Sequence, residues 1–131
     1  KLSADYPYVV IDNEAGMEHL SRRTTHAVNI LVIVSDPTLR GVITAKRISM
    51  LIDELRLTIE RRVVIINRSF DNQVDELKEL AQREGLQIAG MIPSDPAITQ
   101  SDLLGRPLLR ISPESRSLQA LFSVLDSLKI P

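Results

Sequence analysis

Four short runs of apolar residues constrain the fold of this chain more than any other feature of its sequence. They are rich in valine and isoleucine and span residues 8–11, 30–34, 63–66 and 88–92. None shows the polar alternation of a strand with one wet face. Continuous apolar strands are typical of parallel sheets that helices cover on both faces. The sequence therefore predicts an α/β fold with a mostly parallel sheet flanked by helices.

Segments with helical periodicity separate these runs. Between the second and third runs, one face carries Val42, Ile43, Ile48, Leu51, Ile52 and Leu55. Between the third and fourth runs, one face carries Val74, Leu77, Leu80 and Ala81. Asp71 or Asn72 is the expected N-cap of that second helix, and Gly85 its stop. A last helix is expected over residues 115–128, with an inward face of Leu118, Leu121, Phe122, Leu125 and Leu128.

We expect a single domain over residues 1–131, with the element order β-α-β-α-β-α-β-loop-α. The charges, 16 basic and 17 acidic, give no support for a nucleic-acid partner, which usually requires a basic patch. There is no cysteine, hence no disulfide framework and no thiolate metal site. The longest apolar run is far too short to span a membrane, and no signal-peptide pattern opens the chain. We expect a cytoplasmic protein without a membrane partner.

Asp12 follows the first apolar run, and Gly16 lies four positions later. Open α/β sheets bind ligands at the carboxyl ends of their strands, where Asp12 is expected. A glycine leaves its backbone N–H free to approach a phosphate oxygen. Nucleoside triphosphatases use such a pair, so Asp12 and Gly16 are candidate catalytic residues, with Asp12 holding magnesium through water. The alternative is a strand-ending aspartate that caps the next helix.

No phosphate-binding loop accompanies this pair. The chain has five glycines, at positions 16, 41, 85, 90 and 105, and none is followed by lysine. The pattern Gly-x-x-x-x-Gly-Lys-Ser/Thr, which cradles phosphates, is therefore absent. The sequence is either the carboxyl-terminal part of a nucleotide-binding domain, which we favour, or a domain that has lost the function. On its own this chain is expected to hydrolyse no ATP.

Two further segments suit an adenine base. Asn67 follows the third apolar run, and an asparagine amide can pair with both a donor and an acceptor on a base edge. Its alternative role is to satisfy backbone groups of the loop. The fourth run leads into Pro93-Ser94-Asp95-Pro96, a rigid loop that can wall off a base. The alternative here is a turn that opens the next helix.

Together these segments resemble the CooC-type maturation ATPases for carbon monoxide dehydrogenase, within the MinD/nitrogenase iron protein group of deviant P-loop ATPases. The resemblance rests on residues 12–23, 34–38, 66–68 and 92–95, which lie in the right order and cover essentially the whole chain. The first of these segments is the specific one. The others are shared across the wider group.

The resemblance implies a role for each segment. Residues 12–16 match the second switch, and Asn67, with Arg68 beside it, matches the adenine-contacting position. Pro93 to Asp95 match the loop that closes over the base, so the candidate cofactor-binding residues are Asn67, Arg68, Pro93 and Asp95. ATP or ADP with Mg²⁺ would be the cofactors of the full-length parent, with none tightly bound to this chain.

The resemblance also implies partners: a homodimer, with carbon monoxide dehydrogenase or a related nickel/iron–sulfur enzyme as the client for nickel insertion. This sequence departs from the pattern in lacking the phosphate-loop lysine and the cysteine pair of the nickel chaperones. Arg116 and Lys129 are the only cations of the last helix, unlike a basic membrane-targeting tail. A non-catalytic α/β interaction or regulatory module is the alternative. A partitioning or cell-division positioning ATPase fits the fold but not the segment around Glu18 and His19.

The same resemblance places the phosphate-loop strand between the strand that ends at Asp12 and the strand that ends at Ser35. An empty position there would leave backbone groups unpaired, each costing about 1–3 kcal/mol when buried. We therefore predict that residues 8–11 either pair directly with residues 30–34 or are exchanged with a second copy of the chain.

Overall fold

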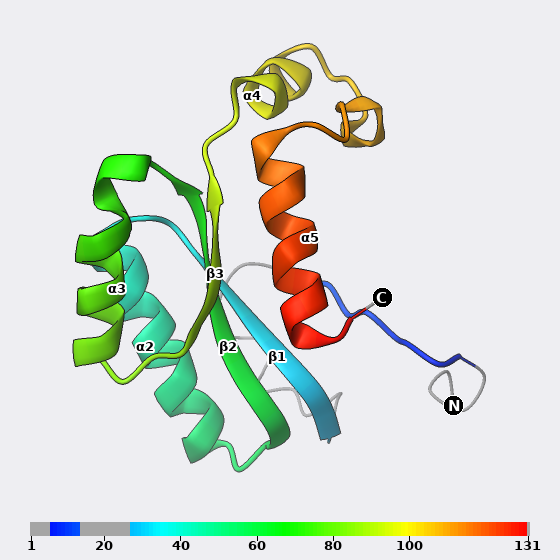
Figure 1. Cartoon of the computed structure of the whole chain (residues 1–131). Helices are drawn as coiled ribbons and strands as arrows, with labels where there is room; N and C mark the ends of the chain where they lie inside the picture. Colours follow the sequence, from blue (N-terminus) through cyan, green and yellow to red (C-terminus); the bar gives the residue numbers. More distant parts are fainter. Residues whose placement is uncertain (1–5, 14–26, 131) are drawn as a thin grey trace.

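The computed structural model describes residues 6–13 and 27–130 (Figure 1). Three parallel strands form a sheet in the order β1-β2-β3: β1 (Ala27–Ser35), β2 (Thr58–Ser69) and β3 (Ile88–Pro93). The α-helices are α2 (Leu39–Glu54), α3 (Val74–Arg83), α4 (Pro96–Leu103) and α5 (Arg116–Leu128). The described residues also contain two 3₁₀ turns, η2 (Asp71–Gln73) and η3 (Leu108–Arg110). The predicted parallel α/β architecture is confirmed.

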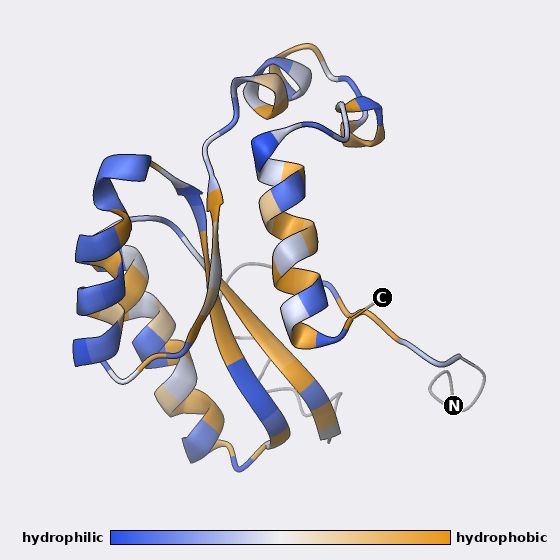
Figure 2. Ribbon diagram, viewed as in Figure 1, coloured by the Kyte–Doolittle hydropathy of each residue, from blue (hydrophilic) through white to orange (hydrophobic). Residues whose placement is uncertain are grey.

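Helices cover both faces of the sheet, with α2 and α3 on one side and α5 on the other (Figure 1). Because side chains alternate along a strand, Val64 and Ile66 pack under α2 and α3, while Val63 and Ile65 pack under α5. The strands are hydrophobic along these buried stretches, and the outer face of α3 is hydrophilic (Figure 2). This two-sided burial explains why the strand sequences lack polar alternation.

Residues 8–11 do not form the predicted strand. The described segment from residue 6 to residue 13 contains no helix or strand, and the Val10 side chain is 89% exposed. In the described part of the chain β1 pairs only with β2, so the predicted direct pairing of residues 8–11 with residues 30–34 is wrong. A β-branched run favours extended backbone, but it becomes a strand only beside a neighbour that accepts and donates its hydrogen bonds. Exchange with a second copy stays a prediction.

The helices confirm most of the periodicity predictions. Gly85, with φ +67°, follows the end of α3 in the left-handed conformation expected of a helix stop. The predicted N-cap of α3 is wrong, because η2 occupies Asp71–Gln73 and Gln73 precedes α3 without a side-chain cap. The inward position of Phe122 is wrong as well, since its side chain is 56% exposed. The inward stripe of α5 instead follows Ser117, Val124 and Leu128, and residue 122 lies outside it.

A close contact fixes α5 on the sheet. A Cβ atom at Gly90 of β3 would collide with the side chain of Val124 of α5. Glycine therefore allows α5 to lie directly on the edge strand. Among the described residues, no helix is both long and apolar enough to cross a membrane.

Candidate functional site

The carboxyl ends of β2 and β3 form the candidate site. Asn67 lies opposite Ile92, and Ser69 lies opposite Pro93, in the parallel register of the two strands. This register brings Asn67, Arg68 and Pro93 to one edge of the sheet, and Asp95 follows shortly after the strand. Ligands of open α/β sheets bind at this edge.

Asn67 is half-buried, and its side chain is partly used by its own loop. Its Oδ1 accepts a hydrogen bond from the backbone N–H of Arg68 at 3.0 Å. The side-chain oxygen of Asn67 therefore has the alternative role, in which it satisfies a backbone group of the loop. Among the described residues the amide NH₂ makes no hydrogen bond, and an amide NH₂ group can donate two.

Arg68 has an unusual backbone. Its φ is +58°, in the left-handed region that non-glycine residues seldom adopt. Its side chain is exposed. The left-handed turn at Arg68 and the register shift of β2 between Asn67 and Ser69 both interrupt the regular ladder at this edge. Such local departures from regular backbone are common next to binding sites.

The loop after β3 is tied to the end of β2. The backbone N–H of Ser94 donates to the carbonyl of Ser69 at 2.9 Å. The Ser69 hydroxyl, buried at 5% exposure, donates to the carbonyl of Ile92 at 3.3 Å. Ser69 is two residues from Asn67 in β2. These two hydrogen bonds therefore hold the loop after β3 close to Asn67.

Asp95 is engaged by both helices that follow it. Its Oδ1 accepts from the N–H of Ala97 at 2.8 Å and so caps α4, which confirms that the loop also opens a helix. Its Oδ2 accepts from the hydroxyls of Ser115 at 2.6 Å and Ser117 at 3.0 Å. The Ser115 hydroxyl first, and then the Ala97 N–H, lower the pKa of the Asp95 carboxyl to about 2.

Ser115 and Ser117 were not among the residues predicted for the site. Ser115 accepts from the N–H of Leu118 and thereby caps α5, and a serine before an apolar periodic segment is a recognisable cap signal. No sequence signal connects either serine to Asp95, because the contact spans about twenty residues and depends on how α5 packs.

A groove of about 600 Å³ lies beside β3. Its walls include Ser69 and Pro93 from the strand ends, Lys78 of α3 and Arg116 of α5. Arg116 pairs with Asp71 at 2.9 Å across the rim, where both side chains are mostly exposed. Of the residues predicted to contact adenine, Pro93 is the one that borders this groove in the described structure.

Of the two predicted switch residues, the structure describes one. Asp12 is exposed in the irregular segment after residue 6, and Gly16 lies outside the described residues. Among the described residues, no group of three histidine, aspartate or glutamate side chains could hold a metal ion. The exposed carboxylate of Asp12 is compatible with magnesium bound through water, because Mg²⁺ keeps several waters and takes few protein ligands.

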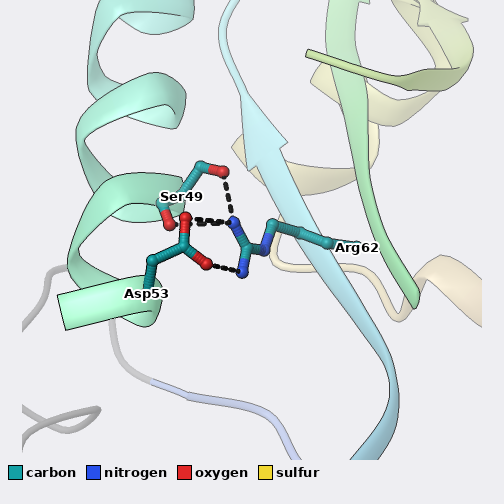
Figure 3. A network of polar contacts seen from close by, with 3 residues as sticks. All are labelled: Ser49, Asp53 and Arg62. Carbon is teal, nitrogen blue, oxygen red and sulfur yellow. Dashed lines mark hydrogen bonds and ion pairs between the residues drawn. The ribbon is translucent and has the colours of Figure 1, made fainter. Parts of the chain in front are cut away.

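A second polar network lies toward the amino end of β2 (Figure 3). Arg62 of β2 donates from Nη1 to the backbone carbonyl and hydroxyl of Ser49 in α2, at 2.9 and 2.7 Å. Its Nη2 pairs with Asp53 Oδ1 at 2.7 Å, and this hydrogen bond lowers the pKa of the Asp53 carboxyl. The network ties α2 to the sheet away from the candidate site, so we assign it a structural role.

Comparison with known proteins identifies relatives of this chain, although no family model matches it. An uncharacterized ATP-binding protein of Methanocaldococcus jannaschii is 40% identical over 107 residues, covering 82% of this chain and 42% of the relative. The carbon monoxide dehydrogenase accessory protein CooC of Rhodospirillum rubrum is 35% identical over 108 residues, covering 82% and 40%. The chain thus spans less than half the length of these curated relatives.

Solved structures share the fold. The MinD cell division protein of Aquifex aeolicus superposes with a TM-score of 0.63 at 21% identity, covering 78% of this chain and 45% of that protein. MinD of Pyrococcus horikoshii, solved with Mg-ADP, superposes with a TM-score of 0.58 at 20% identity, covering 76% and 41%. By sequence the chain is homologous to CooC and to an uncharacterized ATP-binding protein, and by architecture it shares the fold of the MinD proteins.

Proposed function

We propose that this chain is the carboxyl-terminal part of an ATP-binding metallocentre-maturation protein that inserts nickel, and that it carries the second switch and the adenine-binding segments. The observation that carries the proposal is the 35% identity to CooC over 108 residues. The homology to ATP-binding proteins supports an ATPase-related role, and nickel insertion is the finer step that we propose.

The base site would be built from Asn67, Arg68 and the loop from Pro93 to Asp95. The strand register that sets Asn67 beside Ile92 supports this, because it brings the two segments to one edge. The amide NH₂ of Asn67, which has no partner among the described residues, suits the acceptor nitrogens of adenine, and Pro93 offers an apolar wall. When bound, ATP would supply the phosphoanhydride bond whose hydrolysis drives the parent protein.

Asp12 and Gly16 would be the switch residues toward the γ-phosphate, with Asp12 holding Mg²⁺ through water. The exposure of the Asp12 carboxylate is compatible with an outer-sphere role. We further propose a cytoplasmic homodimer whose client is carbon monoxide dehydrogenase or a related nickel/iron–sulfur enzyme. The alternative is a non-catalytic interaction or regulatory module that retains the fold without hydrolysis.

Adenosine titration followed by NMR tests the base site directly. Without phosphate contacts the affinity should be weak, about millimolar, and the amide shifts should cluster at Asn67, Arg68 and Asp95. Asn67→Ala should weaken binding, whereas Asn72→Ala, which alters an exposed asparagine of η2, should leave it unchanged. Shifts elsewhere with Asn67, Arg68 and Asp95 silent would rule out the assignment.

A further inference from the structure

Asp95 joins the starts of α4 and α5, two successive helices that begin at Pro96 and Arg116. Its carboxylate caps α4 through Ala97, and Ser115, which caps α5, donates its hydroxyl to the same carboxylate at 2.6 Å. Ser117 adds its hydroxyl at 3.0 Å and its backbone N–H at 3.5 Å. We call Asp95, Ser115 and Ser117 the carboxylate clamp. It places one negative charge at two helix N-termini, where the backbone dipoles favour it.

The clamp is built into the protein interior on its α5 side. Ser117 is 1% exposed, and its hydroxyl lies 2.8 Å from that of Ser115. A buried hydroxyl needs a partner, and the Asp95 carboxylate supplies one to each serine. Both oxygens of Asp95 are thus already used as acceptors by the protein. This arrangement leaves the carboxylate poorly suited to direct recognition of a base.

The clamp also completes the attachment of the loop. On one side the N–H of Ser94 donates to the carbonyl of Ser69, close to Asn67 in β2. On the other side Asp95 accepts a hydrogen bond from Ser115 at the start of α5. The helix itself packs against β3 through the close contact between Val124 and Gly90. The loop is therefore held between two elements that are themselves packed on the sheet.

We propose that Asp95 is a positioning residue: through Ser115 and Ser117 it holds the loop from Pro93 to Asp95 beside Asn67, without touching the base. This inference rests on the proposed adenine site and changes the role that the sequence suggested for Asp95. It assigns part of the affinity for adenosine to two serines on another helix. Binding groups must be held within about 0.5 Å of their productive geometry by the residues that support them.

The test compares adenosine affinity, from NMR shifts of Asn67 and Arg68, across variants of the full chain. Ser117→Ala and Ser115→Ala should each weaken binding roughly three- to tenfold. Ser115→Thr, which keeps a hydroxyl and a capping oxygen, should restore it. The matched control is Ser127→Ala, because among the described residues the Ser127 hydroxyl bonds within its own helix, to the carbonyl of Val124 at 2.7 Å.

A second readout needs no ligand. The carboxyl carbon shift of Asp95, followed against pH, should report a higher pKa for that carboxyl in both serine-to-alanine variants than in the unmodified chain. A purely packing role for the serines would leave this pKa unchanged and would overturn the inference.

Two other outcomes separate the inference from the proposed function. If Asp95→Asn weakens adenosine binding while Ser115→Ala and Ser117→Ala do not, Asp95 contacts the base and the positioning role is wrong. If the unmodified chain shows no adenosine-dependent shifts at Asn67, the proposed adenine site falls, and the positioning role falls with it. Weakening by both serine variants, with rescue by Ser115→Thr, supports the inference.

Discussion

Gly90 of β3 lies so close to Val124 of α5 that a methyl group at position 90 would collide with the valine side chain. The contact fixes α5, whose N-cap is Ser115 and whose first turn includes Ser117. Gly90→Ala should therefore lower the free energy of unfolding by about 1–3 kcal/mol, as overpacking of a core does. Urea denaturation measures this change.

The cost should depend on Val124. In a Val124→Ala background the added methyl group gains room, so Gly90→Ala should cost less there than in the unmodified chain. An equal cost in both backgrounds would show that backbone conformation at residue 90, and not the contact with Val124, requires glycine.

The carboxylate clamp predicts a pH dependence of stability. The pKa of the Asp95 carboxyl is about 2 in the folded chain against an ordinary value of 3.8. Because this pKa is lowered, the ionised form stabilises the fold, and that contribution is complete above about pH 4 and lost as the pH falls toward 2. The stability difference between the unmodified chain and Asp95→Asn should shrink over this range, as measured by urea unfolding at several pH values.

Asp102→Asn serves as the comparison for that experiment. Asp102 is an exposed residue of α4 whose carboxylate makes no hydrogen bond within the described residues. Its substitution should leave the acid limb of the stability profile close to that of the unmodified chain. If the acid limb of the Asp95→Asn profile also matched that of the unmodified chain, the carboxylate clamp would be contradicted.

The network around Arg62 predicts which of its substitutions destabilises the fold more. Arg62→Lys should destabilise more than Asp53→Asn, because the guanidinium bonds Ser49 as well as Asp53, whereas the Asp53 side chain is 70% exposed. Thermal unfolding of the two variants gives the comparison, with Arg83→Lys on the exposed face of α3 as control. A larger loss for Asp53→Asn would mean that the ion pair, not the bonds to Ser49, ties α2 to β2.

This chain alone should release no phosphate from ATP. Phosphoryl transfer depends on charge neutralisation and positioning by a phosphate loop and its lysine, and the sequence contains neither. A coupled phosphate assay against a blank without protein makes the measurement. Release above the blank that Asp12→Ala abolishes would contradict the prediction.

Exchange of residues 8–11 with a second copy predicts self-association. The segment is exposed, and in the described structure β1 has a neighbour only on its β2 side. Sedimentation equilibrium should show a dimer that Val10→Asp weakens, because a charge in the middle of the exchanged strand opposes its burial. Leu109→Asp, at a position of similar exposure outside the segment, should not weaken it. A monomer at all concentrations would exclude the exchange.

Local pattern was enough to predict much of this protein. The apolar runs at residues 30–34, 63–66 and 88–92 lie within the three observed strands, because helices on both faces of a sheet favour apolar side chains on both sides of its strands. Periodicity and Gly85 predicted the helices between them, since both act within a few residues of the chain. The carboxyl-edge location of Asn67 and Pro93 followed from parallel strands.

Contacts between distant segments decided the rest. Residues 8–11 have strand propensity, but they would form a strand only beside a neighbouring strand that shares their backbone hydrogen bonds. Phe122 is exposed because α5 packs on the sheet through the face that carries Ser117 and Val124. The role of Asp95 was open in the sequence, since its partners Ser115 and Ser117 reach it only after α5 packs on β3. Propensity and periodicity are local properties of the chain, whereas a hydrogen bond between remote residues exists only once tertiary packing has brought them together.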